Sequence, residues 1–521
     1  MTIEVNEIAT PAAYAATTPG KPAFVMGTTG EAVSYAELDD RSARLARVLR
    51  DRGIEPGAHI AVLMENNRPF LEVLWAAQRA GLYYTAVNSH LRTAEVQYVL
   101  DDCGASALVT SEAMASVVAG LDLSVVPTKI AAVGAVPGFE SYQALLAGDQ
   151  AGPAVELEGR EMLYSSGTTG WPKGVRKALP GKPFGDPSTV PAQIARVMRQ
   201  RYQMSADTVY LSTAPLYHAS PLVSNMSVQR LGGTVVLMET FDARRCLELI
   251  QEHRVTHAQF VPTMFVRLLR LSEEERGRYD TSSLQLVVHG AAPCPVRVKQ
   301  RMLDWWGPIL YEFYAGTEDI GGTFITPREW LAHPGSVGRP LTECHVVGAD
   351  GEELPPGQPG VLYFAGGRSF EYHNDTAKTA SIRNDKGWRT LGDIGYLDAD
   401  GYVYLTDRAA HMIISGGVNI YPQEAENVLV LHPAVEDVAV LGVPDPEMGE
   451  AVKAVVRPAD PAAAGPELAA ELLAYCQSEL ASYKCPRTVD FVPELPRDEN
   501  GKLYKRLLRE QYWQGHESRI I

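Results

Sequence analysis

The feature that most constrains the fold is a repeated change between short apolar runs and amphipathic stretches. Turn residues follow each apolar run, and helix-like sequence follows the turn. The clearest apolar runs lie at residues 60–64, 209–212, 234–238, 257–261 and 284–288. Because this alternation is typical of parallel sheets covered by helices, it predicts an α/β fold. In such folds ligands gather at the carboxyl ends of the strands.

One helix can be placed from its start signal. Ser34 and Glu37 are spaced as a capping box, so they predict a helix beginning at residue 35. That helix would carry Leu45 and Leu49 on its apolar side and end at Gly53.

The composition and the spacing of predicted strands change near residue 352, and again after Arg408. Glycine and proline become frequent in the first of these segments, and hairpin-like strands at 360–364 and 402–405 predict a small β-barrel-like part. The segment after Arg408 predicts a smaller α+β unit, with strands at 438–443 and 488–492 and a helix at 467–480. Since 521 residues are too many for one ordinary core, we expect a large domain over 1–408 and a small C-terminal domain over 409–521.

Composition excludes several classes of function. The formal net charge of -16 argues against a nucleic-acid partner, because phosphate backbones require a basic face. The six cysteines form no CxxC pair, so neither a zinc site nor a disulfide framework is expected, and a reducing cytoplasm is the predicted location. We also expect no secretory signal and no transmembrane segment, since no uncharged apolar run reaches roughly 18 residues. A peripheral membrane contact stays open.

The strongest local motif is Tyr-Ser-Ser-Gly-Thr-Thr-Gly-Trp-Pro-Lys-Gly at residues 164–174. Backbone N–H groups and small hydroxyl side chains in such a loop can surround a polyphosphate, and Lys173 adds positive charge. The loop is not a Walker A motif, because Pro172 and Gly174 flank the lysine where glycine and Ser/Thr would be required. A solvated Gly/Thr loop is the alternative, but the length and order of this string favour phosphate binding.

Six further motifs follow in a fixed order. They are Pro-Leu-Tyr-His at 215–218, His-Gly-Ala-Ala-Pro at 289–293, Tyr-Ala-Gly-Thr-Glu at 314–318, Gly-Trp-Arg-Thr-Leu-Gly-Asp at 387–393, Ile-Ile-Ser-Gly-Gly-Val-Asn-Ile-Tyr-Pro at 413–422, and Pro-Arg-Asp-Glu-Asn-Gly-Lys at 496–502. With the glycine-rich loop, this set resembles the ANL superfamily of adenylate-forming enzymes over nearly the whole chain. The likeness is greatest to bacterial acyl-CoA synthetases, so it implies activation of a carboxylic acid by ATP and transfer of the acyl group to coenzyme A (CoA).

The resemblance implies an ATP site built from several of these motifs. The residues carried over to ATP and AMP binding are Ser165, Ser166, Gly167, Thr168, Thr169, Gly170, Lys173, Gly290, Ala291, Ala292, Tyr314, Ala315, Gly316, Asp393 and Arg408. Tyr314 would stack on adenine, and the two acceptor oxygens of Asp393 would bind the ribose hydroxyls. Ala315 and Leu391 depart from the family pattern, which usually has glycine and threonine there.

Four residues are implied in the adenylation chemistry. Thr317 would bind the α-phosphate, and Glu318 would hold Mg²⁺ through a hard oxygen ligand. Lys502 would be the adenylation catalyst, and His218 would border the acyl pocket and respond to ATP. A carboxylate is already a nucleophile at neutral pH, so the step needs positioning and electrostatic stabilisation rather than a general base.

A second set of residues is implied in thiol transfer. Ser415, Gly416 and Gly417 would face the acyl-adenylate while the pantetheine arm of CoA passes them. Lys502 and this turn cannot occupy one site together, so the small domain would be mobile and rotate between the steps. Ala410 stands at the hinge position, where the family has Asp or Lys, and His411 follows where an acid is usual. Rotation should survive, because hinge residues need only absorb backbone change.

The acid itself is less constrained by the sequence. The expected pocket wall is His218, Leu222, Asn225, Val261, Thr263 and His289, together with the unusual stretch 176–203. This mostly apolar wall favours a medium-chain, long-chain or bulky hydrophobic acid. The alternatives are an aryl-acid CoA ligase of the 4-coumarate or benzoate kind, an acyl-AMP ligase that loads a carrier protein, a luciferase-like oxidase and an inactive binding protein. The expected cofactors and substrates are ATP, Mg²⁺ and CoA, with the enzyme a monomer or a homodimer.

Overall fold

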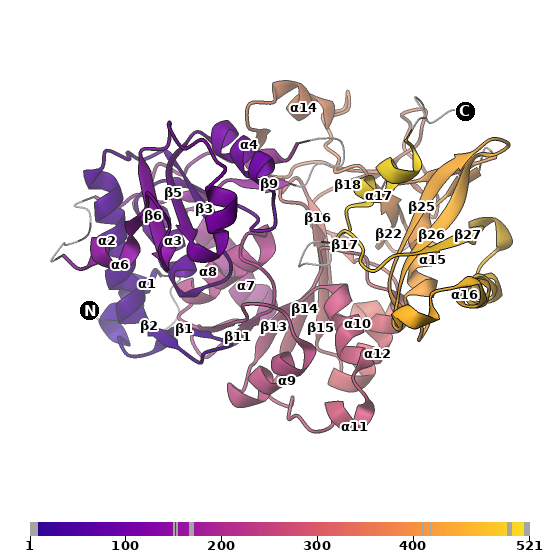
Figure 1. The fold of residues 1–521 in the computed structure, drawn as a ribbon, viewed down its shortest axis with the longest axis horizontal. Coiled ribbons are helices and arrows are strands. Elements are labelled where there is room, and N and C mark those ends of the chain that lie inside the picture. The colour runs from indigo at the N-terminus through magenta and orange to yellow at the C-terminus, as the bar shows by residue number, and fades with distance from the viewer. Residues whose placement is uncertain are drawn as a thin grey trace.

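The fold comes from a computed structural model that describes residues 9–148, 152, 155–165, 171–408, 411–416, 418–497 and 503–514. The elements form two large mixed layers and a smaller C-terminal lobe (Figure 1). The predicted α/β class is therefore confirmed. Among the described helices, none combines the length and apolar character that a bilayer span needs.

A nine-stranded sheet forms the centre of the molecule. Its order is β17-β16-β15-β14-β13-β11-β12-β1-β2. The strands are β1 Pro22–Met26, β2 Ala32–Ser34, β11 Val209–Ser212, β12 Thr234–Leu237, β13 His257–Phe260, β14 Leu286–His289, β15 Leu310–Ala315, β16 Gly322–Ile325 and β17 Arg339–Pro340. The pairs from β1 through β15 are parallel apart from the β1–β2 hairpin, as the alternating sequence pattern predicts.

The two faces of this sheet carry different side chains. Figure 1 shows α7 (Val190–Tyr202) and α8 (Ala219–Arg230) over one face, and α9 (Ala243–Glu252), α10 (Pro262–Arg270) and α12 (Val296–Trp306) over the other. In register across the α10–α12 face lie Leu211, Ala258, Val287 and Leu310, which are buried in an apolar core with those helices. The neighbouring row, Ser212, Gln259, Val288 and Tyr311, must face α7 and α8, because side chains alternate along a strand.

A six-stranded parallel sheet forms the N-terminal layer, in the order β7-β6-β5-β3-β4-β8. Its strands are β3 His59–Leu63, β4 Tyr83–Ala86, β5 Ala105–Ser111, β6 Thr128–Val133, β7 Glu140–Ser141 and β8 Arg160–Glu161. The helices α2 (Tyr35–Asp51), α3 (Arg68–Arg79) and α4 (Thr93–Cys103) pack with it. The predicted capping box is present, since the Glu37 N–H donates to Ser34 and the Ser34 N–H donates to Glu37.

Two small sheets flank the ends of the central strands. One contains β9 (Leu163–Ser165), β10 (Lys173–Arg176) and β20 (Glu371–Tyr372). The other is antiparallel, in the order β18 (Cys344–Val347), β19 (Gly360–Phe364), β21 (Asp393–Leu397) and β22 (Val403–Arg408). This second sheet occupies the segment for which a barrel-like part was expected.

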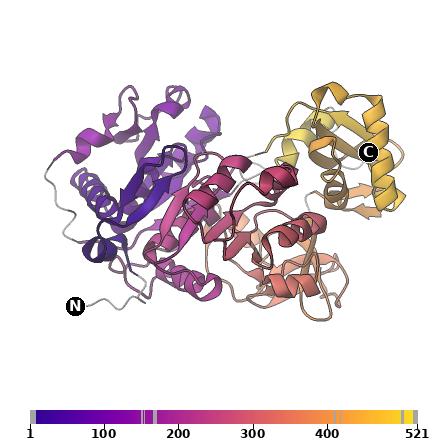
Figure 2. The same ribbon diagram turned by 90° about the horizontal axis from the view of Figure 1, so that it is seen from below.

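The C-terminal lobe lies beside the rest of the chain (Figure 2). It contains β23 (Ile413–Ser415), β24 (Val418–Ile420), β25 (Val435–Asp445), β26 (Gly449–Pro458) and β27 (Thr488–Phe491), with α15 (Pro422–Leu429), α16 (Pro466–Glu479) and α17 (Lys505–Tyr512). Arg270 donates to the carbonyl of Val435, 2.6 Å away, and Arg297 pairs with Glu479 at 2.7 Å, so α10 and α12 contact this lobe. The sheets change between Arg408 and Ile413, and the domain boundary at 408/409 remains a prediction.

Candidate active site

The end of β15 meets the start of β21, which brings two distant motifs into contact. The Tyr314 hydroxyl donates to Oδ2 of Asp393 at 2.5 Å. Asp393 is only 6% exposed and pairs across the sheet with Arg408, whose side chain lies outside the described residues. The arrangement places an aromatic ring beside a buried carboxylate. This combination suits a nucleoside, which carries both a flat base and a ribose.

The turn after β14 packs closely against Phe313, the residue before Tyr314. A Cβ at Gly290 would lie 2.7 Å from the Phe313 carbonyl oxygen and 3.0 Å from its ring, so only glycine fits there. Ala291 has a φ of +69°, a left-handed conformation that is uncommon for alanine. Strained residues of this kind concentrate at ligand sites, and the small side chains of Ala291 and Ala292 leave the backbone open to a planar ring.

Glu318 is 8% exposed at the turn that follows Tyr314. Its Oε1 accepts a hydrogen bond from the Tyr372 hydroxyl at 2.9 Å, and its Oε2 lies against Gly316. Burial and the nearby Glu318 carboxylate both raise the pKa of Tyr372, so the tyrosine remains a neutral donor. A buried carboxylate with one oxygen fixed in this way fits a Mg²⁺ ligand. Thr317 beside it is half-buried, and Ala315 is exposed.

The glycine-rich loop is described only at its two ends. Ser165 closes β9 and Lys173 opens β10, whereas Ser166, Gly167, Thr168, Thr169 and Gly170 lie outside the described residues. Lys173 forms an ion pair with Oδ2 of Asp375 at 2.7 Å. The pair raises the pKa of Lys173 and lowers the pKa of Asp375. Asp375 was missed in the sequence, although its helix-capping role before α14 (Thr376–Ser381) was readable there.

Contacts from α4 fix both flanks of the same loop. The exposed Trp171 ring stacks on Tyr98, with ring centroids 4.9 Å apart. The Tyr164 hydroxyl donates to Asp102 at 2.5 Å, and Asn374 donates to the backbone carbonyl of Asp102 at 3.1 Å. The loop therefore spans two anchored ends beside Lys173.

His218, which the sequence resemblance predicts at the acid pocket, is half-buried at the N-cap of α8. The next turn of α8 carries polar side chains toward the sheet. Ser220 accepts from Gln259 at 2.6 Å, and Asn225, which is fully buried, donates to Ser212 at 2.8 Å. The sequence predicted Asn225 near the acid but gave no signal for Ser220 or Gln259.

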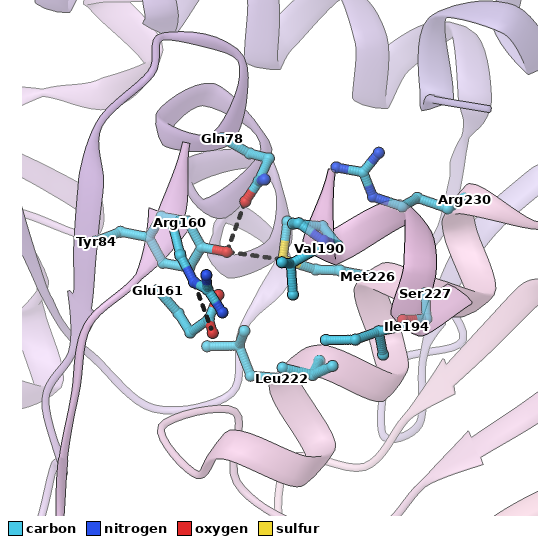
Figure 3. A pocket seen from close by; sticks show the side chains of 12 residues that line it. Gln78, Tyr84, Arg160, Glu161, Val190, Ile194, Leu222, Met226, Ser227 and Arg230 are labelled. Carbon is cyan, nitrogen blue, oxygen red and sulfur yellow. Dashed lines mark hydrogen bonds and ion pairs between the residues drawn. The ribbon is translucent and has the colours of Figure 1, made fainter. Parts of the chain in front are cut away.

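Leu222 faces a different space, between α7 and α8. Figure 3 shows it with Val190 and Ile194 on one side of a small cavity and with Tyr84 and Glu161 on the other. The cavity of about 20 Å³ has room for one or two waters and not for an acyl chain. Leu222 is thus a core residue beside a water-sized void in this structure.

His289 lies on the face of the sheet opposite to Asn225, so the two do not form one pocket wall as the sequence predicted. Its register partners are Phe260 and Glu312, which places its side chain on the α10–α12 face of the sheet. It is fully buried, with its ring 5.3 Å from that of Phe265 and Nε2 3.5 Å from Glu312. Burial, and then the nearby Lys299, hold the pKa of His289 well below its usual value. The prediction for His289 was wrong because the pleat of a strand fixes which face of the sheet each side chain lies on, even at the end of the strand.

The two remaining expected pocket residues belong to the start of α10. Val261 is its N-cap and packs into the apolar core, and Thr263 is the second helical residue and half-buried. The described structure therefore brings His218 and Asn225 to the α8 side of the sheet, and places Leu222, Val261 and His289 in packed cores.

The turn after β23 is held tightly in the C-terminal lobe. Ser415 is buried, and Gly416 has a φ of +57° with its N–H donating to the carbonyl of Met448 at 2.8 Å. A Cβ at Gly416 would lie 2.5 Å from the Met448 methyl group. A groove of about 280 Å³ adjoins this turn; Val418, Met448, Tyr483 and Arg487 are among the residues that line it. Gly417 lies outside the described residues.

Lys502 and Ala410 also lie outside the described residues. The chain on each side of Lys502 is nevertheless anchored. Arg497 pairs with Asp437 at 2.6 Å, and Lys505 pairs with Glu426 at 2.8 Å.

Comparison with known proteins agrees with these motifs. A sequence model of the AMP-binding enzyme family matches residues 12–371, and one of the AMP-binding enzyme C-terminal domain matches residues 424–502. The feruloyl-CoA synthase of an Amycolatopsis species is 35% identical over 492 residues, which cover 93% of this chain and 94% of that protein. The long-chain-fatty-acid–CoA ligase FadD13 of Mycobacterium tuberculosis H37Rv is 31% identical over 509 residues, or 96% of this chain and 97% of that protein. The solved o-succinylbenzoate CoA synthetase MenE of Bacillus subtilis, in complex with its acyl-adenylate intermediate, superposes with a TM-score of 0.77 at 27% identity, covering 96% of this chain and 97% of that one.

Proposed function

Since this chain belongs to the AMP-binding family of adenylate-forming enzymes, we propose that it is an ATP-dependent acid:CoA ligase acting on a hydrophobic carboxylic acid. The observation that carries the proposal is the convergence of Tyr314, Asp393 and Glu318 at the carboxyl end of the central sheet. We assign the Tyr314–Asp393 pair to the nucleoside, and the buried carboxylate of Glu318, four residues after Tyr314, to a divalent metal. The relatives are named as a CoA synthase and a CoA ligase of two different acids, so they support the reaction but differ in its substrate.

In the first step a carboxylate oxygen of the acid attacks the α-phosphorus of ATP, and the bond to the bridging oxygen breaks to release pyrophosphate. Lys173 stabilises the charge on the leaving phosphates, and Thr317 and Lys502 position the α-phosphate and the acid. Glu318 would hold Mg²⁺, and the ion would supply charge neutralisation at the phosphates. These groups act by position and charge, because the nucleophile is already ionised.

In the second step the CoA sulfur attacks the acyl carbon, the thiol loses its proton, and AMP leaves. We assign the turn at Ser415–Gly417 to this step and the groove beside it to the CoA side. Because Lys502 and this turn belong to one lobe, a rotation of that lobe about Ala410 would exchange them. The free thiols of all six cysteines suit an enzyme of the reducing cytoplasm.

An aromatic acid is the second candidate substrate class, and a specific observation favours it. Half-buried aromatic rings, those of Tyr311, Phe313 and Phe324, lie on the α8 side of the sheet. A flat ring packs well against other rings, whereas a flexible chain gains less from them.

The test is mass spectrometry of reactions that contain Mg-ATP, CoA and a panel of straight-chain, aryl and polycyclic acids. We expect acyl-CoA, AMP and pyrophosphate with at least one hydrophobic acid, and formation slower by ~10²–10³ in the Lys502→Ala variant. Acyl-AMP without acyl-CoA would instead indicate a carrier protein as the acceptor. No pyrophosphate with any acid would support an inactive binding protein and overturn the proposal.

A further inference from the structure

A buried ion pair joins β15 to the helix that follows the β14 turn. Lys299, in the first turn of α12, is fully buried, and Glu312 on β15 is 4% exposed. The Lys299 ammonium donates to Oε2 of Glu312 at 2.6 Å. Neither side chain has a part in the two chemical steps proposed above, so the pair calls for another explanation.

Glu312 contacts the chain on both sides of that turn. Its register partner on β14 is His289, the last residue of the strand, and His289 Nε2 lies 3.5 Å from Glu312 Oε2. Its other partner, Lys299, belongs to α12, which begins at Val296 just after the turn. Figure 1 shows α12 beside β14 and β15. One carboxylate therefore holds both ends of the segment 290–295.

The turn between β14 and α12 carries Gly290, Ala291 and Ala292, which the sequence resemblance assigns to AMP. Gly290 packs directly against Phe313, the residue after Glu312 on β15. Ala291 has a φ of +69°. A left-handed alanine persists only where the surrounding structure over-determines it. The ends of this turn must therefore be held firmly, and the ion pair is placed to hold them.

The surroundings of the pair are apolar. Val298 and Met302 of α12 belong to the core on this face of the sheet, and the Trp330 ring centroid lies 4.8 Å from the Lys299 ammonium. Replacing a buried ion pair by apolar residues of similar size often leaves stability equal or higher, so stability alone does not account for it. A charge-assisted hydrogen bond does impose a distance and a direction, which apolar contacts do not.

We propose that Lys299 and Glu312 are positioning residues for the nucleotide base, an inference that rests on the AMP site of the proposed ligase function. Both are buried, so they act through the turn and not by touching the ligand. Glu312 also lies on the same face of β15 as Tyr314, two residues earlier, because side chains alternate along a strand. The pair thus sets the turn and the Tyr314 ring relative to each other.

The experiment measures AMP binding to the full-length enzyme by calorimetry, together with the thermal midpoint. Lys299→Met and Glu312→Leu should each weaken AMP binding about tenfold, the size of one well-made hydrogen bond. The double variant should regain much of the thermal midpoint, since it leaves no buried charge unpaired, yet keep the weakened affinity. Glu312→Gln retains an acceptor for Lys299 and should weaken AMP less than Glu312→Leu.

Arg41→Met is the matched control. It breaks a 2.7 Å pair with the fully buried Glu72, which joins α2 to α3 in the N-terminal layer. It should lower the thermal midpoint and leave the AMP affinity unchanged. Wild-type affinity in the double variant would overturn the inference, because the pair would then serve stability alone. Weakened AMP binding in Arg41→Met would overturn it too, because any loss of stability would then have the same effect.

Kinetics with an accepted acid give a second readout. The Lys299→Met and Glu312→Leu variants should raise the KM for ATP and leave the KM values for the acid and CoA unchanged, and an equal rise in all three would contradict the inference. A wild type that binds AMP but activates no acid would overturn the ligase function and leave the positioning role standing. A wild type that binds no AMP would overturn both.

Discussion

The Tyr314 hydroxyl and the Asp393 carboxylate are joined by a 2.5 Å hydrogen bond, although 79 residues separate them. The bond ties the central sheet to the small antiparallel sheet where a ribose would lie. A carboxylate offers about four acceptor sites on its two oxygens, and the Tyr314 hydroxyl uses one of them.

Asp393→Ala should raise the KM for ATP about 10- to 100-fold, since hydrogen bonds to a charged group contribute about 1.5–3 kcal/mol. Steady-state kinetics at saturating acid and CoA would measure it. Asp400→Asn, an exposed carboxylate in the turn after β21, is the control and should leave the KM unchanged. An equal effect of both substitutions would show general damage to the small sheet.

Asp375→Asn should lower the KM for ATP by up to about fivefold, the range of a partly exposed ion pair. The carboxylate competes with the triphosphate for Lys173, and asparagine can still cap α14. Lys173→Met should raise the same KM. Glu371→Gln, which breaks a neighbouring pair with Arg176 at 3.4 Å, is the control. A higher KM in Asp375→Asn would mean instead that the aspartate holds the lysine in its working position.

Lys502→Ala should slow acyl-adenylate formation by ~10²–10³, judged from the loss of single stabilising donors elsewhere. Thiol transfer from supplied acyl-adenylate should remain largely intact, because the lysine is needed only in the first step. Pyrophosphate release and acyl-CoA formation can be followed separately. Arg506→Ala, on an exposed face of α17, should change neither. Equal loss of both half-reactions would contradict the assigned role.

Gly416→Ala should slow the thiol step about tenfold or more and let acyl-AMP accumulate. The new Cβ would collide with Met448 and would also strain a backbone with a φ of +57°. Gly401→Ala separates these causes, since Gly401 has a φ of +80° but open space around its Cβ position. A normal rate of the thiol step in Gly416→Ala would contradict the role of this turn in the second half-reaction.

His289→Leu should reduce the pH dependence of stability without changing the preference among acids. Burial lowers the folded-state pKa of His289, so below about pH 6.5 the unfolded chain binds more protons and the native state loses stability. One such histidine contributes a slope of up to about 1.4 kcal/mol per pH unit, and the variant should lose that share. Urea unfolding at pH 7.5 and 5.5 would measure it. A changed acid preference would contradict this prediction and indicate that His289 affects acid binding.

The parts predicted from sequence are those that depend on neighbouring residues. The strands at 209–212 and 360–364 have the predicted bounds, and Ser34 and Glu37 form the predicted capping box. Apolar periodicity and end-of-helix hydrogen bonds are local properties, so a linear pattern contains them. The order of motifs along the chain likewise identified the family before any contact was known.

The sequence alone thus determined the fold class, the two-part organisation and the chemistry of adenylate formation. Only the tertiary structure decided which side chains share a surface. It paired Lys173 with Asp375, gathered Ser220 and Gln259 between α8 and the sheet, and placed His289 on the opposite face. The physical reason is that strand register and pleat fix the direction of every side chain, and a shift of one residue would reverse it.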